Sequence, residues 1–244
     1  MYSLLIGINY YNTPYQLNGC INDVNQMRVY LRNYQKIPKN HIYTLTDNNP
    51  KRMPTYRNIM AYFKKMTKLK RAKKIWIYYS GHGTYIRDRN NDELDNRDES
   101  IVPCDFKKTN YITDDILNAI FRKFVKSCKV IFIADCCNSG TVADLPYRYD
   151  THDKNLIENN VRLMRNNILS ITGCADNQPS YESFINGQTR GALTNAFISI
   201  MIRTKGKLSC FNMLNSLRIY MLKNNFNQAP QICSTILLTK RTMV

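Results

Sequence analysis

Short apolar runs rich in Ile, Val and Tyr alternate with longer amphipathic segments along this chain, and this alternation constrains the fold more than any other feature. Most of the runs lack internal polar alternation, which is typical of strands buried on both faces of a sheet. Strands that alternate with helices predict right-handed crossovers and a mostly parallel central sheet with helices on both faces, an α/β fold. The predicted strands are 3–8, 41–45, 74–79, 129–134 and 168–172. The predicted helices are 21–34, 56–69, 113–124, 191–204 and 209–223.

The chain of 244 residues has no internal repeat and no linker-like composition, so we expect a single domain over 1–244. Two helix starts carry capping signals, namely Ser209 before Asn212, and Thr113 before two aspartates. Two polar segments, 87–99 and 141–167, are longer than the usual connections and read as loops after the third and fourth strands. Ligands bind at the carboxyl ends of parallel strands, so we expect the functional site there.

The sequence predicts a cytoplasmic protein. No stretch approaches the roughly 20 apolar residues of a membrane-spanning helix. The opening MYSLLIGINYY reads as a first strand, so neither a signal peptide nor a pro-segment is expected. The eight cysteines form no C-x-x-C pair, which argues against structural zinc and favours reduced thiols.

A formal net charge of +17 raises the question of nucleic-acid binding. The basic residues are scattered, with one modest cluster, KKMTKLKRAKK, at 64–74. We interpret this cluster as a solvated face; a patch for nucleic acid or another anionic surface is the alternative. None of the aromatic and basic motifs of nucleic-acid-binding modules is present, so nucleic acid is not an expected partner.

A histidine and a cysteine follow the third and fourth predicted strands. The third runs IWIYYSGHG and ends on His82 between two glycines, and the fourth runs VIFIADCCNSG through Cys136 and Cys137. Adjacent strand ends bring such residues together, and an imidazole beside a thiol favours the nucleophilic thiolate. Neighbouring residues on a strand point to opposite faces, so only one of the two cysteines can face His82.

Five motifs resemble those of metacaspases, and they occur in the same order along nearly the whole chain. They are GINYY…LNGCINDV, YYSGHGT, DELDNRDESIVPCD, DCCNSGT and ITGCADNQPSYES…GALTNAFI. The resemblance implies a caspase-type fold, a monomer, and a calcium-dependent peptidase that cuts protein or peptide substrates after Arg or Lys. It makes Cys137 the nucleophile, His82 the base and Cys136 a bystander.

The resemblance also implies an acidic specificity pocket. Its members in this chain are Cys20, Asp23, Ser80 and Asp135. Two carboxylates in a partly desolvated pocket favour a guanidinium or ammonium group over an acidic side chain. The simpler structural interpretations are a first-turn helix acid for Asp23 and a turn former for Asp135. For the oxyanion, we expect backbone N–H groups near Gly83 and Cys137.

Calcium is the expected cofactor. Six of the 18 acidic residues fall within 88–99, although their spacing is not that of an EF-hand, and by itself this run reads as a solvated loop. The resemblance implies instead a Ca²⁺ site shared by four aspartates from three segments. These are Asp98, Asp114, Asp115 and Asp144.

One departure from the family pattern supports a second hypothesis. The residue after the nucleophile is usually His, and here it is Asn138. The alternative to an active peptidase is therefore a pseudo-enzyme that keeps the fold as a calcium-responsive regulatory module. If the chain processes itself, the basic residues within reach in the 145–167 segment are Arg148, Lys154, Arg162 and Arg165.

Overall fold

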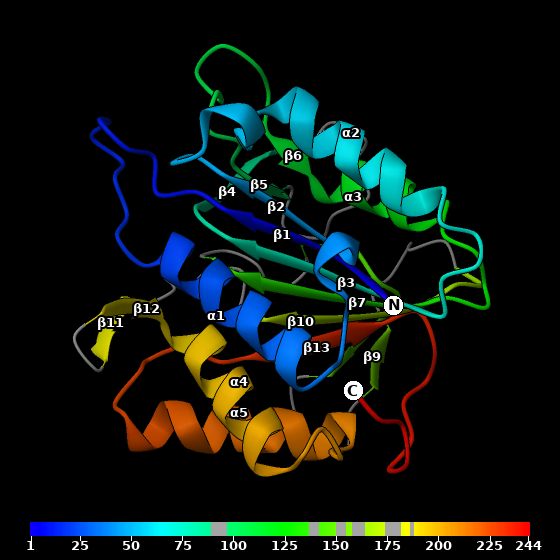
Figure 1. Ribbon diagram of the computed structural model, residues 1–244. Helices are drawn as coiled ribbons and strands as arrows, with labels where there is room; N and C mark the ends of the chain where they lie inside the picture. Colours follow the sequence, from blue (N-terminus) through cyan, green and yellow to red (C-terminus); the bar gives the residue numbers. More distant parts are fainter. Residues whose placement is uncertain (89–96, 137–141, 150–154, 158–163, 174–181, 186–187) are drawn as a thin grey trace.

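The computed structural model describes residues 1–88, 97–136, 142–149, 155–157, 164–173, 182–185 and 188–244, and its centre is an eight-stranded sheet (Figure 1). Five strands run parallel in the order β2-β1-β3-β7-β10. Their bounds are β1 Tyr2–Gly7, β2 Ile42–Thr46, β3 Lys74–Ser80, β7 Lys129–Asp135 and β10 Asn167–Thr172. All five were predicted, and each begins and ends within one residue of the expected position.

Beyond β10 the sheet continues with antiparallel strands. These are β13 (Gln231–Ser234), β8 (Tyr147–Tyr149) and β9 (Asn155–Ile157), in that order. The strand order reverses at β1, which lies between β2 and β3. This reversal places a topological switch point beside the carboxyl ends of β1 and β3.

Helices cover both faces of the sheet, as predicted (Figure 1). One face carries α2 (Tyr56–Thr67) and α3 (Asp114–Phe121), and the other carries α1 (Cys20–Asn33), α4 (Ala192–Arg203) and α5 (Cys210–Lys223). The alternation of side chains along β3 divides the core between the faces. Trp76 and Tyr78 pack toward α1 and α4, whereas Tyr79 packs on the α2 face.

Hydroxyl side chains cap three of the helices. The predicted caps are confirmed, since Thr113 Oγ1 accepts from the Ile116 N–H at 3.4 Å and Ser209 Oγ accepts from the Asn212 N–H at 3.3 Å. Thr55 caps α2 in the same way. Each cap satisfies one of the N–H groups that the first turn of a helix leaves without a partner.

Short antiparallel strands occupy parts of the chain that the sequence suggested were loops. After β3, a second sheet is formed by β4 (Gly83–Arg87), β5 (Arg97–Ile101) and β6 (Ile112–Thr113). The ends of the polar segment 87–99 therefore belong to strands, and residues 89–96 lie outside the described part of the chain. A hairpin of β11 (Glu182–Ile185) and β12 (Gln188–Gly191) leads into α4.

The segment 141–167 is likewise not a plain loop. It contributes β8 and β9 to the main sheet, so Arg148 lies in a strand paired on both sides, with β13 and β9. A paired backbone is a poor substrate for a peptidase, and the proposal of Arg148 as an exposed processing site is wrong on this point. Arg165 is exposed, while Lys154 and Arg162 lie outside the described residues.

Within the described residues, no helix combines the length and the apolar character needed to cross a membrane. The six cysteines of this part of the chain are free thiols. Burial raises the pKa of Cys104 to about 12 and the pKa values of Cys128 and Cys210 to about 11, so these thiols stay protonated near neutral pH.

Candidate active site

His82 lies two residues beyond the end of β3, and its imidazole is hydrogen-bonded to the loop between β1 and α1. Its Nε2 atom is 2.8 Å from the backbone carbonyl oxygen of Tyr15. Because a carbonyl oxygen only accepts hydrogen bonds, Nε2 carries the proton of the neutral ring and Nδ1 is left as the basic nitrogen. The Tyr10 ring packs against the imidazole with 4.7 Å between centroids. These contacts hold the ring in one tautomer.

Two tyrosine hydroxyls fix the backbone of His82. The His82 N–H donates to the Tyr10 hydroxyl at 3.0 Å, and the Tyr79 hydroxyl donates to the His82 carbonyl at 2.7 Å. Burial raises the pKa of both phenols well above the usual value, so both remain protonated. Only glycine fits at position 81, because a Cβ there would lie 2.6 Å from the Tyr79 hydroxyl.

The hydrogen bonds of the His82 backbone affect which N–H groups can bind the oxyanion of the reaction intermediate. The His82 N–H is already bonded to Tyr10, so it is not available to a substrate oxygen. Gly83 opens β4, and Cys137 lies outside the described residues. The roles of Gly83 and Cys137 as oxyanion donors stay predictions.

Asp23 lies in the first turn of α1 and is only 1% exposed. Its carboxylate accepts a hydrogen bond from Ser80 Oγ at 3.0 Å. The Gly191 N–H points at both of its oxygens, at 3.0 and 3.1 Å. Ser80 reaches this carboxylate because it ends β3 on the same face as Trp76 and Tyr78, the face that α1 covers.

Asp135, the last residue of β7, is 5% exposed and anchors the start of α4. Its Oδ2 accepts from the Thr194 N–H at 2.9 Å and from the Thr194 hydroxyl at 2.7 Å. The Tyr78 hydroxyl, 2.6 Å from Thr194 Oγ1, therefore donates to that oxygen. Burial first, and then the negative charges of Asp23 and Asp135, raise the pKa of Tyr78 well above its usual value.

The two carboxylates converge beside Gly191. A methyl group built there would lie 2.1 Å from Asp135 Oδ2 and 2.9 Å from Asp23 Oδ2. The structure thus brings Asp23, Ser80 and Asp135 together at the carboxyl ends of β3 and β7, where the sequence predicted a specificity pocket. Two buried acids in one place form a site that attracts a cation.

The structure describes Cys20 and Cys136 of the predicted site but not Cys137. Cys20 is the first residue of α1, is 4% exposed, and donates its backbone N–H to Asn9 Oδ1 at 3.1 Å. Cys136 is 1% exposed in the core on the α2 face, which supports its interpretation as a bystander. Cys137, the predicted nucleophile, lies outside the described residues, as does Asn138.

A cavity lies between α3 and the small sheet formed by β4, β5 and β6. Asp98 and Asp115 line this space of about 490 Å³ together with Asn110, Thr113 and Arg87, and the remaining lining residues are Tyr56, Ile86, Tyr111 and Ile116. Carboxylate, amide and hydroxyl oxygens are ligands that calcium accepts, and no thiol or imidazole of the described chain is among them.

The other two predicted calcium ligands make different contacts. Asp114 is buried, and its two oxygens accept the backbone N–H groups of Glu99 at 2.7 Å and Asp115 at 2.8 Å. The Asp144 carbonyl accepts from Asn118 Nδ2 at 2.6 Å, which ties the segment after β7 to α3. Across the described ranges, no three His, Cys, Asp or Glu side chains are grouped closely enough to hold a metal.

Several residues of the site were not identified from the sequence. The Tyr15 carbonyl could not be found because any residue supplies a backbone oxygen. Gly191 and Thr194 do lie in the GALTNAFI motif, but their role depends on α4 beginning beside Asp23 and Asp135, which only the tertiary fold reveals.

Comparison with known proteins gives a consistent result. The family model described as the metacaspase, peptidase C14 domain matches residues 2–146. A curated relative, Metacaspase-2 of Trypanosoma brucei brucei, is 33% identical over 96% of this chain and 72% of its own length. Metacaspase-1 of Scheffersomyces stipitis is 30% identical over 95% of this chain and 70% of its own.

Solved structures share the fold. A protein of Geobacter sulfurreducens superposes with a TM-score of 0.67 at 24% identity, covering 100% of this chain and 98% of the other. Caspase-1 of Spodoptera frugiperda superposes with a TM-score of 0.64 at 9% identity, covering 96% of this chain and 86% of the other. The predicted caspase-type α/β fold is therefore confirmed.

Proposed function

The chain belongs to the metacaspase family of cysteine-type endopeptidases, and from this premise we propose that it is activated by calcium and cleaves proteins after Arg or Lys. Cys137 acts as the nucleophile and His82 as its base in this proposal. The observation that carries the specificity is the convergence of two buried carboxylates, Asp23 and Asp135, at one end of the sheet. A guanidinium or ammonium group entering there gains charge-assisted hydrogen bonds, whereas an acidic side chain is repelled.

The contacts of His82 support a dyad mechanism. Nδ1 takes the thiol proton of Cys137, and the positive imidazolium that results is stabilised by the Tyr15 carbonyl at Nε2. The thiolate attacks the substrate carbonyl to form a tetrahedral intermediate. Its oxyanion accepts hydrogen bonds from backbone N–H groups near Gly83 and Cys137. His82 then protonates the leaving amine, and a thioester remains on Cys137. Water, deprotonated by His82, hydrolyses the thioester and regenerates the thiol.

Two aspartates in the cavity between the small sheet and α3 support the calcium part of the proposal. Asp98 and Asp115 would hold the ion there, with Asp114 and Asp144 beside them on α3 and on the segment that follows β7. Bound calcium supplies positive charge that relieves the repulsion among these carboxylates. The residues themselves already tie the segment after Cys137 to α3 through the contact between Asn118 and Asp144.

The free thiols support a location in a reducing compartment. Six described cysteines, five of them buried, form no disulfide with one another. Structural disulfides are rare in the cytosol and common in secreted proteins. We therefore propose a cytoplasmic location. We also propose that the enzyme acts on protein substrates as a monomer.

The test compares a fluorogenic peptide ending in Arg with the same peptide ending in Asp, with calcium and with a chelator. Wild type, Cys137→Ala and Asp135→Asn are assayed side by side. We expect calcium-dependent release from the Arg peptide alone, none from Cys137→Ala, and a loss of about 10- to 100-fold in kcat/KM for Asp135→Asn.

Each arm addresses a different part of the proposal. Peptide cleavage that persists in chelator would contradict calcium activation, but it would still support the proposed peptidase activity. Equal cleavage of the Asp peptide removes the acidic pocket. If folded protein cleaves none of the peptides, the proposed peptidase activity is contradicted and the pseudo-enzyme hypothesis is favoured.

A further inference from the structure

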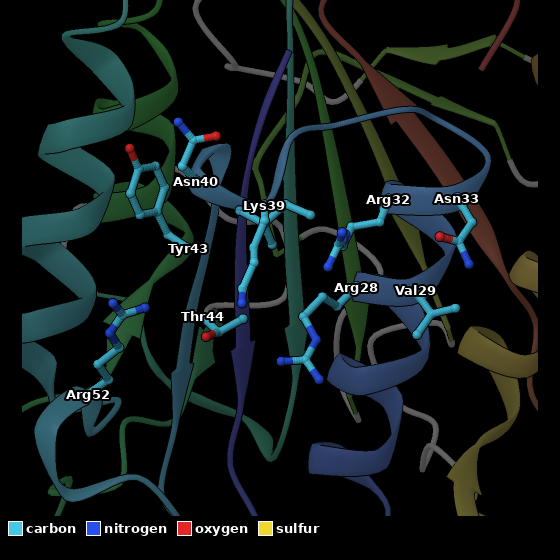
Figure 2. A pocket seen from close by; sticks show the side chains of 10 residues that line it. Arg28, Val29, Arg32, Asn33, Lys39, Asn40, Tyr43, Thr44 and Arg52 are labelled. Atoms are coloured by element: carbon cyan, nitrogen blue, oxygen red, sulfur yellow. The ribbon is translucent and has the colours of Figure 1, made fainter.

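A large cavity opens beside the edge strand β2 (Figure 2), and none of its lining residues in the described chain belongs to the candidate active site. Its volume is about 790 Å³, within the range of small-molecule binding sites. The cavity is bounded by the last turns of α1, by the 3-10 turn Lys39–His41 that precedes β2, and by the 3-10 turn Pro50–Arg52 that follows it. Nothing in the proposed peptidase mechanism uses it.

Four cations from three segments of the chain line this cavity. Figure 2 shows Arg28 and Arg32 extending from α1 toward Lys39, with Arg52 on the opposite side of the view. No acidic residue of the described chain lines the cavity, and within that part of the chain the four side chains form no ion pair or hydrogen bond. The cavity therefore holds concentrated positive charge without an internal counter-ion.

All four cationic side chains are exposed to solvent, so the cavity is an open one, and its spacing and lining distinguish it from a scattered basic face. Arg28 and Arg32 are one helical turn apart on the same side of α1, and a like-charge pair at this spacing destabilises a helix. Neutral hydrogen-bonding groups, including Thr44, lie among the cations. Charge, hydrogen-bond donors and a concave shape in one place are the properties of an anion-binding site.

The chemistry of the lining favours phosphate. Three of the four cations are arginines, whose planar guanidinium donates two parallel hydrogen bonds to a phosphate group. Several such groups around one space match a ligand with several neighbouring phosphates better than a single small anion. We propose that this cavity binds a compound with two or more adjacent phosphate groups, held by Arg28, Arg32, Lys39 and Arg52.

The aromatic lining argues against single-stranded nucleic acid. Base stacking needs an open aromatic face. Tyr43 is the one aromatic residue of the described chain that lines the cavity, and Lys65 Nζ lies over its ring, 4.0 Å from the centroid. The ring also packs near Tyr62, with 5.8 Å between centroids. The phosphates, rather than bases, are therefore the expected recognition element.

Binding is tested by isothermal titration calorimetry on the 244-residue chain with the substitution Cys137→Ala, which removes the proposed nucleophile and so prevents self-cleavage. The probes are tripolyphosphate and ATP, at about 0.15 M salt. We expect one site per chain, and a loss of affinity of at least about tenfold in the double variant Arg28→Gln/Arg32→Gln. The matched control is Arg203→Gln/Lys207→Gln, which removes the same charge from exposed positions outside the cavity and should change the affinity less than about threefold.

The outcomes separate the alternatives. Equal affinity for tripolyphosphate and ATP supports recognition of phosphates alone, and tighter binding of ATP supports a nucleoside triphosphate. Equal losses in both double variants would mean diffuse attraction by the net charge and would overturn the proposal, as would the absence of binding by either probe. A poly-Glu peptide or an RNA oligomer that binds the cavity more tightly than tripolyphosphate also overturns it. Circular dichroism and melting temperature verify that each variant is folded.

Discussion

At the scale of single residues, the candidate pocket depends on the absence of a side chain at Gly191. The backbone there has φ −69° and ψ 136°, a conformation that any residue adopts. Glycine is needed for a different reason, since a Cβ would lie 2.1 Å from Asp135 Oδ2 and 2.9 Å from Asp23 Oδ2. Contacts this short force both carboxylates to move.

Gly191→Ala should therefore reduce kcat/KM for the Arg peptide by about 100-fold, because a shift of about 1 Å in a substrate-positioning group has an effect of this size. The measurement is steady-state cleavage of the fluorogenic Arg peptide in calcium. Gly173→Ala is the matched control, since a Cβ there would meet its nearest atoms at 3.4 and 3.5 Å, which is ordinary contact. If Gly191→Ala is folded and as active as the control, the two carboxylates do not form the specificity pocket.

The residues of the site differ in how far the sequence predicts them. Asp23, Ser80 and Asp135 were identified by motif, and the structure does bring these three together. The hydrogen bond from His82 to Tyr15 could not be predicted, because it depends on where a loop places a backbone carbonyl. Motifs reveal side chains with distinctive chemistry, whereas backbone partners appear only when the chain is folded.

At the scale of elements, the predictable part of the fold is the part that is buried on both faces. Strands such as β3 and β7 consist almost entirely of apolar residues, so their pattern is unambiguous. The strands that were missed, such as β8 and β9, have three residues each and include polar side chains. Their pairing depends on partners far along the chain, such as β13, and no local pattern encodes that.

The caps of α2 and α3 allow a prediction at this scale. Thr113→Ala should lower the free energy of unfolding by about 0.5–1 kcal/mol, because it removes the cap that binds the Ile116 N–H. Since α3 carries Asp114 and Asp115, the same variant should also raise the calcium concentration needed for half-maximal activity. Denaturant titration and a calcium titration of peptidase activity measure the two effects.

Thr55→Ala separates the two effects. It removes the corresponding cap of α2, which binds the Asn58 N–H at 3.2 Å. Thr55 does not line the cavity between the small sheet and α3. It should cost similar stability and leave the calcium midpoint unchanged. If both variants raise the calcium concentration for half-maximal activity equally, calcium activation does not depend specifically on α3.

At the scale of the whole molecule, part of the positive charge lies along one edge of the main sheet. The chain carries a formal net charge of +17, and the edge strand β2 lies beside the cavity lined by four cations. An unpaired strand edge invites pairing with another chain, and charged side chains are a common means of preventing it. The opposite edge, β9, has only three residues.

These edges predict a monomer. Two copies paired symmetrically through β2 would place two cavities, each lined by four cations, beside the same interface, because a two-fold contact uses the same surface of both copies. Light scattering on a sizing column should therefore give a mass near 28.6 kDa at about 0.15 M salt. Association only at about 1 M salt, where the screening length falls to about 3 Å, would identify charge repulsion as the force that keeps the copies apart. A species of roughly twice the monomer mass at low salt, where repulsion is strongest, would contradict the prediction.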